Sequence, residues 1–79
     1  MNVMKLKEVI NNNIVYYYQP EGEGEFGEII YESDIDEARV SKRAEKDDGG
    51  FNYGMKAVRK VEEFVIKKNL PIYYTQAWY

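Results

Sequence analysis

The sequence predicts an α+β domain in which an antiparallel-rich sheet of three to four strands carries one long helix on one face. Two observations indicate this fold. Short β-branched and aromatic runs alternate with Gly-, Asn- and Asp-rich turns in the first half, and a single amphipathic segment at 52–69 then precedes a last aromatic run. The expected order is strand, strand, strand, helix, strand. A chain of 79 residues makes one domain, 1–79, with a small core.

The first segment, 3–10, fits two structures. Val3, Leu6 and Ile10 have helical spacing, but the even-numbered apolar residues also alternate as they would in a strand. We expect a short amino-terminal helix that runs into the turn at 11–13, because asparagine tolerates the left-handed conformation that ends helices. A hairpin into the next strand is the alternative.

Three strands are expected before the long helix. The run 14–18 is β-branched and aromatic throughout, and Pro20 ends it. A second strand is expected at 28–32, after a glycine-rich connection. A third is expected at 38–44, where small and apolar residues alternate with polar ones.

The long helix is expected from Asn52, which can cap its first turn, to about Asn69. Pro71 prevents its continuation, and a last strand is expected at 72–78. One face of this helix is apolar, and its residues are Ala57, Val58, Val61, Phe64 and Val65.

A single helix covers only one face of such a sheet, although several strands are apolar on both faces. Beneath the helix we place Ile14, Tyr16, Tyr18, Ile29, Tyr31, Val40, Ile72, Tyr74 and Trp78. On the opposite face we place Val15, Tyr17, Phe26, Ile30, Tyr73 and Tyr79. Because exposed apolar patches mark interaction sites, we expect the opposite face to be covered by the amino-terminal segment, a second copy or a foreign partner. The alternative is that its tyrosine hydroxyls simply reach water.

The composition favours contact over catalysis. The chain has eight tyrosines but neither histidine nor cysteine, so the commonest bases, thiolate nucleophiles and metal ligands are missing. Ser33, Ser41 and Thr75 have no histidine to activate them. We expect a protein that is not an enzyme and that has no cofactor and no metal site.

The segment Gly22–Ile29 resembles the phosphate-binding loop of protein kinases, with the pattern G-x-G-x-F-G. The resemblance ends there, because the chain lacks the histidine of the kinase catalytic loop and the Asp-Phe-Gly motif. Glutamates at positions 21, 23, 25 and 28 would also repel phosphate. We therefore expect a hairpin connection whose glycines adopt unusual backbone angles.

Charge divides the chain into two halves, with a net charge of −7 over residues 1–38 and +4 over 39–79. Either the halves neutralise one another across the sheet, or an acidic face meets a basic partner. The overall acidity disfavours nucleic-acid binding. Since no apolar run has the length of a signal peptide or a membrane span, we expect a cytoplasmic protein without membrane contact.

Together these observations predict a small cytoplasmic protein-interaction or regulatory module with a protein partner or self-association. A homodimer through the aromatic sheet face is one form of it. The expected interaction surface consists of Val15, Tyr17, Ile30, Tyr73 and Tyr79. The alternative is an acidic inhibitor or nucleic-acid mimic that acts through Glu21–Glu37, with a surface of Glu21, Glu23, Glu25 and Glu28. An enzyme or a nucleic-acid-binding module is less favoured.

Overall fold

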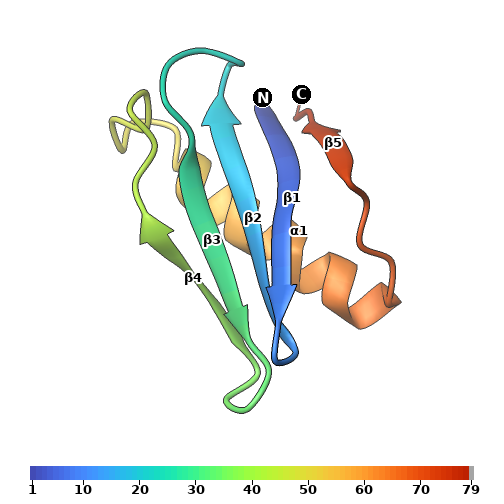
Figure 1. Cartoon of the computed structure of the whole chain (residues 1–79). Coiled ribbons are helices and arrows are strands. Elements are labelled where there is room, and N and C mark those ends of the chain that lie inside the picture. Colours follow the sequence, from blue (N-terminus) through green and yellow to red (C-terminus); the bar gives the residue numbers. More distant parts are fainter. Residues whose placement is uncertain (79) are drawn as a thin grey trace.

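Five antiparallel strands form one sheet, and a single helix packs against it (Figure 1). The computed structural model describes residues 1–78. Its elements are β1 (Asn2–Ile10), β2 (Asn13–Pro20), β3 (Gly27–Glu32), β4 (Glu37–Lys42), α1 (Tyr53–Lys67) and β5 (Tyr73–Gln76). In the sheet the order is β4-β3-β2-β1-β5, so the first four strands form a meander and α1 returns the chain to β5 beside β1. The α+β class with one helix on one face is confirmed.

The predicted amino-terminal helix is wrong, because residues 2–10 form β1, an inner strand that pairs with both β2 and β5. Four strands therefore precede the helix, and the sheet has five strands rather than three or four. An isolated helix of this length would be marginal, whereas the strand gains hydrogen-bonding partners on both sides. The hairpin alternative is correct. Asn11 and Asn12 both have positive φ, 51° and 67°, as a two-residue turn between right-twisted strands requires.

The core lies between α1 and the sheet. Its fully or nearly fully buried side chains include Met4, Tyr16, Tyr18, Ile29, Ala57, Val58, Val61 and Phe64. The apolar face predicted for the helix is thus confirmed. Ile72 is a wrong prediction, because it precedes β5 and is 77% exposed. Its carbonyl accepts a hydrogen bond from the Leu6 N–H (2.9 Å), so its main chain continues the edge of the sheet while its side chain remains exposed to solvent.

The start of α1 differs in detail from the predicted cap. Asn52 is the N-cap residue, but it is left-handed (φ 54°) and its side chain makes no capping hydrogen bond. At the other end Lys68 takes the left-handed conformation (φ 54°). The Asn69 N–H then donates to the Phe64 carbonyl (3.0 Å), which is the hydrogen bond of a Schellman motif. No helix formed by residues 1–78 has the length and apolar character needed to cross a membrane.

Candidate interaction surface

The side of the sheet opposite α1 is here called the open face, and Figure 1 looks onto it with the helix behind. Strand alternation and register give this face Val3, Lys5, Glu8, Val15, Tyr17, Gln19, Glu28, Ile30, Glu32, Glu37, Arg39, Lys42, Tyr73 and Thr75. No helix or strand among residues 1–78 lies over it. It is therefore a sheet face that no element of the described residues covers.

The strand register brings four of the predicted interaction residues together on the open face. Lys5 pairs with Tyr17 on one side and with Tyr73 on the other, so the two tyrosines flank one lysine. Val15 pairs with Ile30 in the adjacent part of the sheet. Tyr73 is 58% exposed, whereas Val15 is 9% exposed and contributes mainly to packing. The fifth predicted residue, Tyr79, lies outside the described residues.

Lysine side chains lie across the aromatic rings of this face. The Lys5 ammonium is 5.2 Å from the centroid of the Phe26 ring, and the Lys7 ammonium is 5.5 Å from that of Tyr17. Phe26 and Tyr17 themselves are 5.5 Å apart between ring centroids. Lys7 also donates to Glu28 (3.1 Å), and this hydrogen bond raises the pKa of Lys7. The open face is thus amphipathic, with rings and charges interleaved.

Sequence reasoning missed Lys5 and Lys7, because both lie in the segment that was expected to be helical. A register irregularity between Leu6 and Glu8 makes Lys7 the extra residue of β1. Lys7 lies over the Tyr17 ring and Lys5 over the Phe26 ring, so both lysines contact the same pair of aromatic rings. Strand alternation from Val3 onward was the signal that could have placed Lys5 beside Tyr17.

The four glutamates of the alternative acidic surface lie in two places. Glu21, Glu23 and Glu25 are in the exposed connection between β2 and β3, whereas Glu28 is on the open face and pairs with Lys7. Glu21 accepts hydrogen bonds from the Met1 ammonium (2.9 Å) and the Tyr53 hydroxyl (2.7 Å), which lower its pKa. Glu23 and Glu25 are exposed, although the main chain of Glu25 is bonded to Glu45, and the acidic-mimic hypothesis stays a prediction.

The glycines of this connection have the structural role expected of them. Gly22 and Gly24 have positive φ, 70° and 77°. A Cβ atom on Gly27 would come within 2.4 Å of the Ala44 main-chain nitrogen. The segment joins β2 to β3 as a hairpin connection, and the glycines allow its turn and the close approach of the neighbouring chain.

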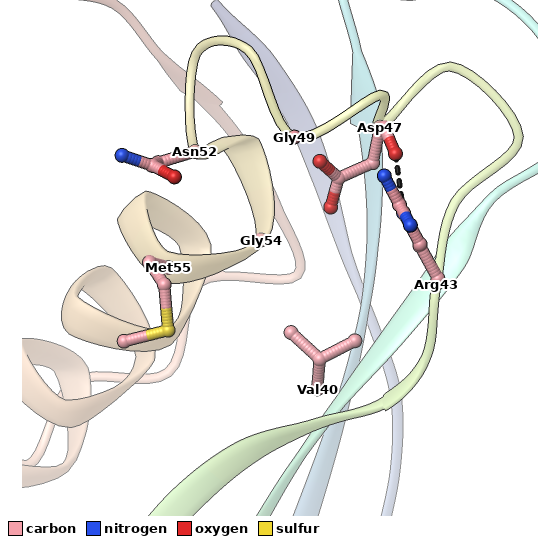
Figure 2. Close-up of a pocket in the computed structure, with 7 residues that line it drawn as sticks. All are labelled: Val40, Arg43, Asp47, Gly49, Asn52, Gly54 and Met55. Carbon is pink, nitrogen blue, oxygen red and sulfur yellow. Dashed lines mark hydrogen bonds between the residues drawn. The ribbon is translucent and has the colours of Figure 1, made fainter.

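A hollow of about 320 Å³ lies between β4, the connection after it and the start of α1. Figure 2 shows the residues that line it, which are Val40, Arg43, Asp47, Gly49, Asn52, Gly54 and Met55. The Asp47 carboxylate is buried and accepts a hydrogen bond from the Tyr18 hydroxyl (2.7 Å). That hydroxyl accepts in turn from the Ala44 N–H (3.1 Å). Burial raises the pKa of Tyr18 to about 12, so the phenol stays protonated and donates to the carboxylate.

The polar groups of this hollow hold the connection in place. Arg43 donates through its Nε to the Asp47 carbonyl (Figure 2), so the acid and the base beside the hollow are both engaged with the chain itself. Across residues 1–78, no three acidic side chains gather as the ligands of a metal ion would. The arrangement anchors residues 43–52 to the sheet and leaves the open face as the candidate site.

The open face is thus defined by its strand register, by the exposed ring of Tyr73 and by the side chains of Lys5 and Lys7. Comparison of the chain with protein families, with curated proteins and with solved structures finds no significant match. The function is therefore inferred from the geometry of the open face.

Proposed function

We propose that this chain is a non-enzymatic protein-interaction module that binds a protein partner through its open face. The observation that carries the proposal is the row Tyr73, Lys5 and Tyr17 across three neighbouring strands, over which no element of residues 1–78 packs. Tyrosine suits such a surface, because its ring provides rigid apolar contact area and its hydroxyl remains hydrated until a partner arrives.

The charges of the open face favour a protein surface over nucleic acid. The cations of the face are Lys5, Lys7, Arg39 and Lys42, and its acids are Glu8, Glu28, Glu32 and Glu37. Lys7 is bonded to Glu28 (3.1 Å) and Arg39 to Glu32 (2.7 Å), so the face has no excess of positive charge. A phosphate backbone requires an excess of positive charge, whereas a protein interface combines an aromatic centre with charges of both signs at its rim.

The outer side of α1 provides a matched control surface. Met55 and Ile66 are 51% and 80% exposed, which is comparable with Tyr73, but they are about three turns apart along the helix. The polar residues Arg59 and Glu62 lie between them. Isolated exposed apolar residues of this kind are usual on folded proteins.

Affinity capture from the native cell with mass spectrometry tests the proposal. Three baits are compared: the wild type, Tyr17→Ser with Tyr73→Ser, and the control Met55→Ser with Ile66→Ser. We expect a protein that the wild type and the control capture and that the tyrosine variant loses. Circular dichroism verifies that all three baits are folded. Equal capture by the tyrosine variant would show that the open face is not the binding surface.

A fourth bait, Glu23→Gln with Glu25→Gln, examines the acidic alternative in the same experiment. Under the open-face proposal this bait keeps the partner, and capture changes little between low and high salt. Loss of the partner with this bait, together with steep weakening by salt, would instead support an acidic inhibitor that acts through the connection between β2 and β3.

A further inference from the structure

We propose that the free edge of β5 pairs antiparallel with β5 of a second copy of this chain, so that two sheets join into one across a twofold axis. This inference goes beyond the proposed function, because it concerns the edge of the sheet rather than its open face. Figure 1 shows β5 as the outermost strand on the side where the chain ends. Within residues 1–78, β1 is the only strand that pairs with it.

The two edges of the sheet differ in protection. The β4 edge carries Glu37, Arg39 and Lys42, and its register with β3 shifts between Glu28 and Ile29. Charges and bulges are the features by which natural sheets prevent further strands from adding. The segment 72–78 around β5 has no charged residue, no proline and no glycine. It is aromatic and rich in β-forming residues, which is typical of a strand that accepts another.

Hydrogen-bond alternation shows which main-chain groups of β5 point outward. The Leu6 N–H donates to the Ile72 carbonyl, and Lys5 pairs with Tyr73 in the same register. In an antiparallel pair every second residue bonds the neighbouring strand, so Tyr74 faces β1 while Tyr73 and Thr75 direct their N–H and C=O groups to the free edge. With Tyr74 on the twofold axis, Tyr73 of one copy lies opposite Thr75 of the other. All outward groups of both residues then find partners.

The side chains agree with this register. On the open face it places Tyr73 beside the second copy's Thr75, which is a favourable aromatic and β-branched cross-strand pair. On the helix side it places the two Tyr74 rings next to one another. A hollow of about 210 Å³ lies beside Tyr74, lined also by Lys60, Glu63, Phe64, Lys67, Asn69 and Pro71. This hollow offers room for the ring of the second copy.

Charge does not oppose the pairing. Lys60 and Lys67, the two cations beside that hollow, both bond Glu63 at 2.7 Å. The strand residues that face one another carry no charge. Pairing through one short strand covers less area than a standard interface of roughly 1,200–2,000 Å² in total, so we expect a weak dimer, with a dissociation constant on the order of 10–100 μM.

Sedimentation equilibrium from about 1 μM to about 1 mM tests the inference. We expect the wild type to shift from monomer to dimer over this range and Thr75→Pro to remain monomeric. Proline there removes an N–H that points away from β1, so the sheet of the single copy is retained. Thr75→Val keeps both the N–H and the branched side chain, and it should dimerise like the wild type. A wild type that stays monomeric throughout, or a Thr75→Pro variant that dimerises equally well, would overturn the inference.

Cross-linking gives a second readout that does not depend on the folding of the proline variant. Because the chain has no cysteine, one introduced residue reports on a single position. Tyr74→Cys on the twofold axis should form a disulfide-linked dimer at least tenfold faster than Ile66→Cys on the outer side of α1. Equal rates would contradict the pairing. Tyr17→Ser should leave self-association unchanged while it lowers partner capture, so failure of either proposal can be distinguished from failure of the other.

Discussion

The hydroxyl of Tyr18 anchors the connection between β4 and α1. The Tyr18 ring is fully buried, and its hydroxyl donates to the Asp47 carboxylate and accepts from the Ala44 N–H. Tyr18→Phe keeps the ring in the core and removes both hydrogen bonds. It leaves a buried carboxylate and a buried N–H without these partners, which costs more than the loss of an exposed bond.

The expected cost follows from these two groups. A hydrogen bond to a charged acceptor contributes about 1.5–3 kcal/mol, and a buried N–H left without a partner costs about 1–3 kcal/mol. Because Asp47 borders the hollow and can turn toward water, we expect a loss near the lower end of the sum, about 3 kcal/mol in the free energy of unfolding. For a domain of this size the total is only about 4–12 kcal/mol. Denaturant unfolding followed by circular dichroism measures the change.

Two comparisons make this measurement specific. Tyr17→Phe changes the adjacent residue on the open face and should alter the free energy of unfolding by less than about 0.5 kcal/mol. A double-mutant cycle of Tyr18→Phe with Asp47→Ala, which removes the acceptor, isolates the energy that couples the pair. If Tyr18→Phe costs under about 1 kcal/mol, or if the two substitutions are additive, the hydrogen-bonded anchor proposed for residues 43–52 is refuted.

Three further predictions follow from the same core. Gly54→Ala should destabilise the fold by about 1–2 kcal/mol in denaturant unfolding although alanine favours helices, because its Cβ would lie 2.9 Å from a Val40 methyl as well as 2.8 Å from an Asp47 oxygen and would overpack the site. Alkaline titration should show that the phenols of Tyr16, Tyr18 and Tyr53 ionise near pH 12 instead of 10. Because these phenols ionise at lower pH in the unfolded chain, the free energy of unfolding should fall as pH rises from 10 to 12. Gln76→Leu removes the amide that joins Asn2 to the Lys56 carbonyl, so hydrogen exchange should accelerate in β5 while the rate in β3 is retained.

The parts of the fold that local pattern specifies could be predicted from the sequence. The buried residues of α1 between Ala57 and Phe64 are those that a period of 3.6 residues places on the apolar face. Alternation likewise assigned Tyr16, Tyr18 and Ile29 to the helix side and Tyr17 and Ile30 to the open face. In each case the local periodicity and the final packing agree.

The amino-terminal strand could not be predicted in the same way, because its conformation depends on distant partners. Val3, Leu6 and Ile10 satisfy a helical spacing, and only pairing with residues 13–20 and 73–76 makes the segment a strand. This error had a consequence for the site. The position of Lys5 between Tyr17 and Tyr73 depends on β1 lying between β2 and β5, which is a property of the sheet order and not of any local segment.

The structure also explains why the chain contains so many tyrosines, which composition alone did not. The hydroxyls of four buried tyrosines each reach a residue of a connecting segment; the pairs are Tyr16 with the Pro71 carbonyl, Tyr18 with Asp47, Tyr31 with Asp36, and Tyr53 with Glu21. Phenylalanine would fill the same core but leave these connections without an anchor. A small domain has a limited core and long connections, so packing alone does not hold the connections in place. These hydrogen bonds fix the connecting segments to the core. The number of tyrosines is therefore largely explained by the fold, and the argument for a partner depends on the position of Tyr17 and Tyr73 beside Lys5 on the open face.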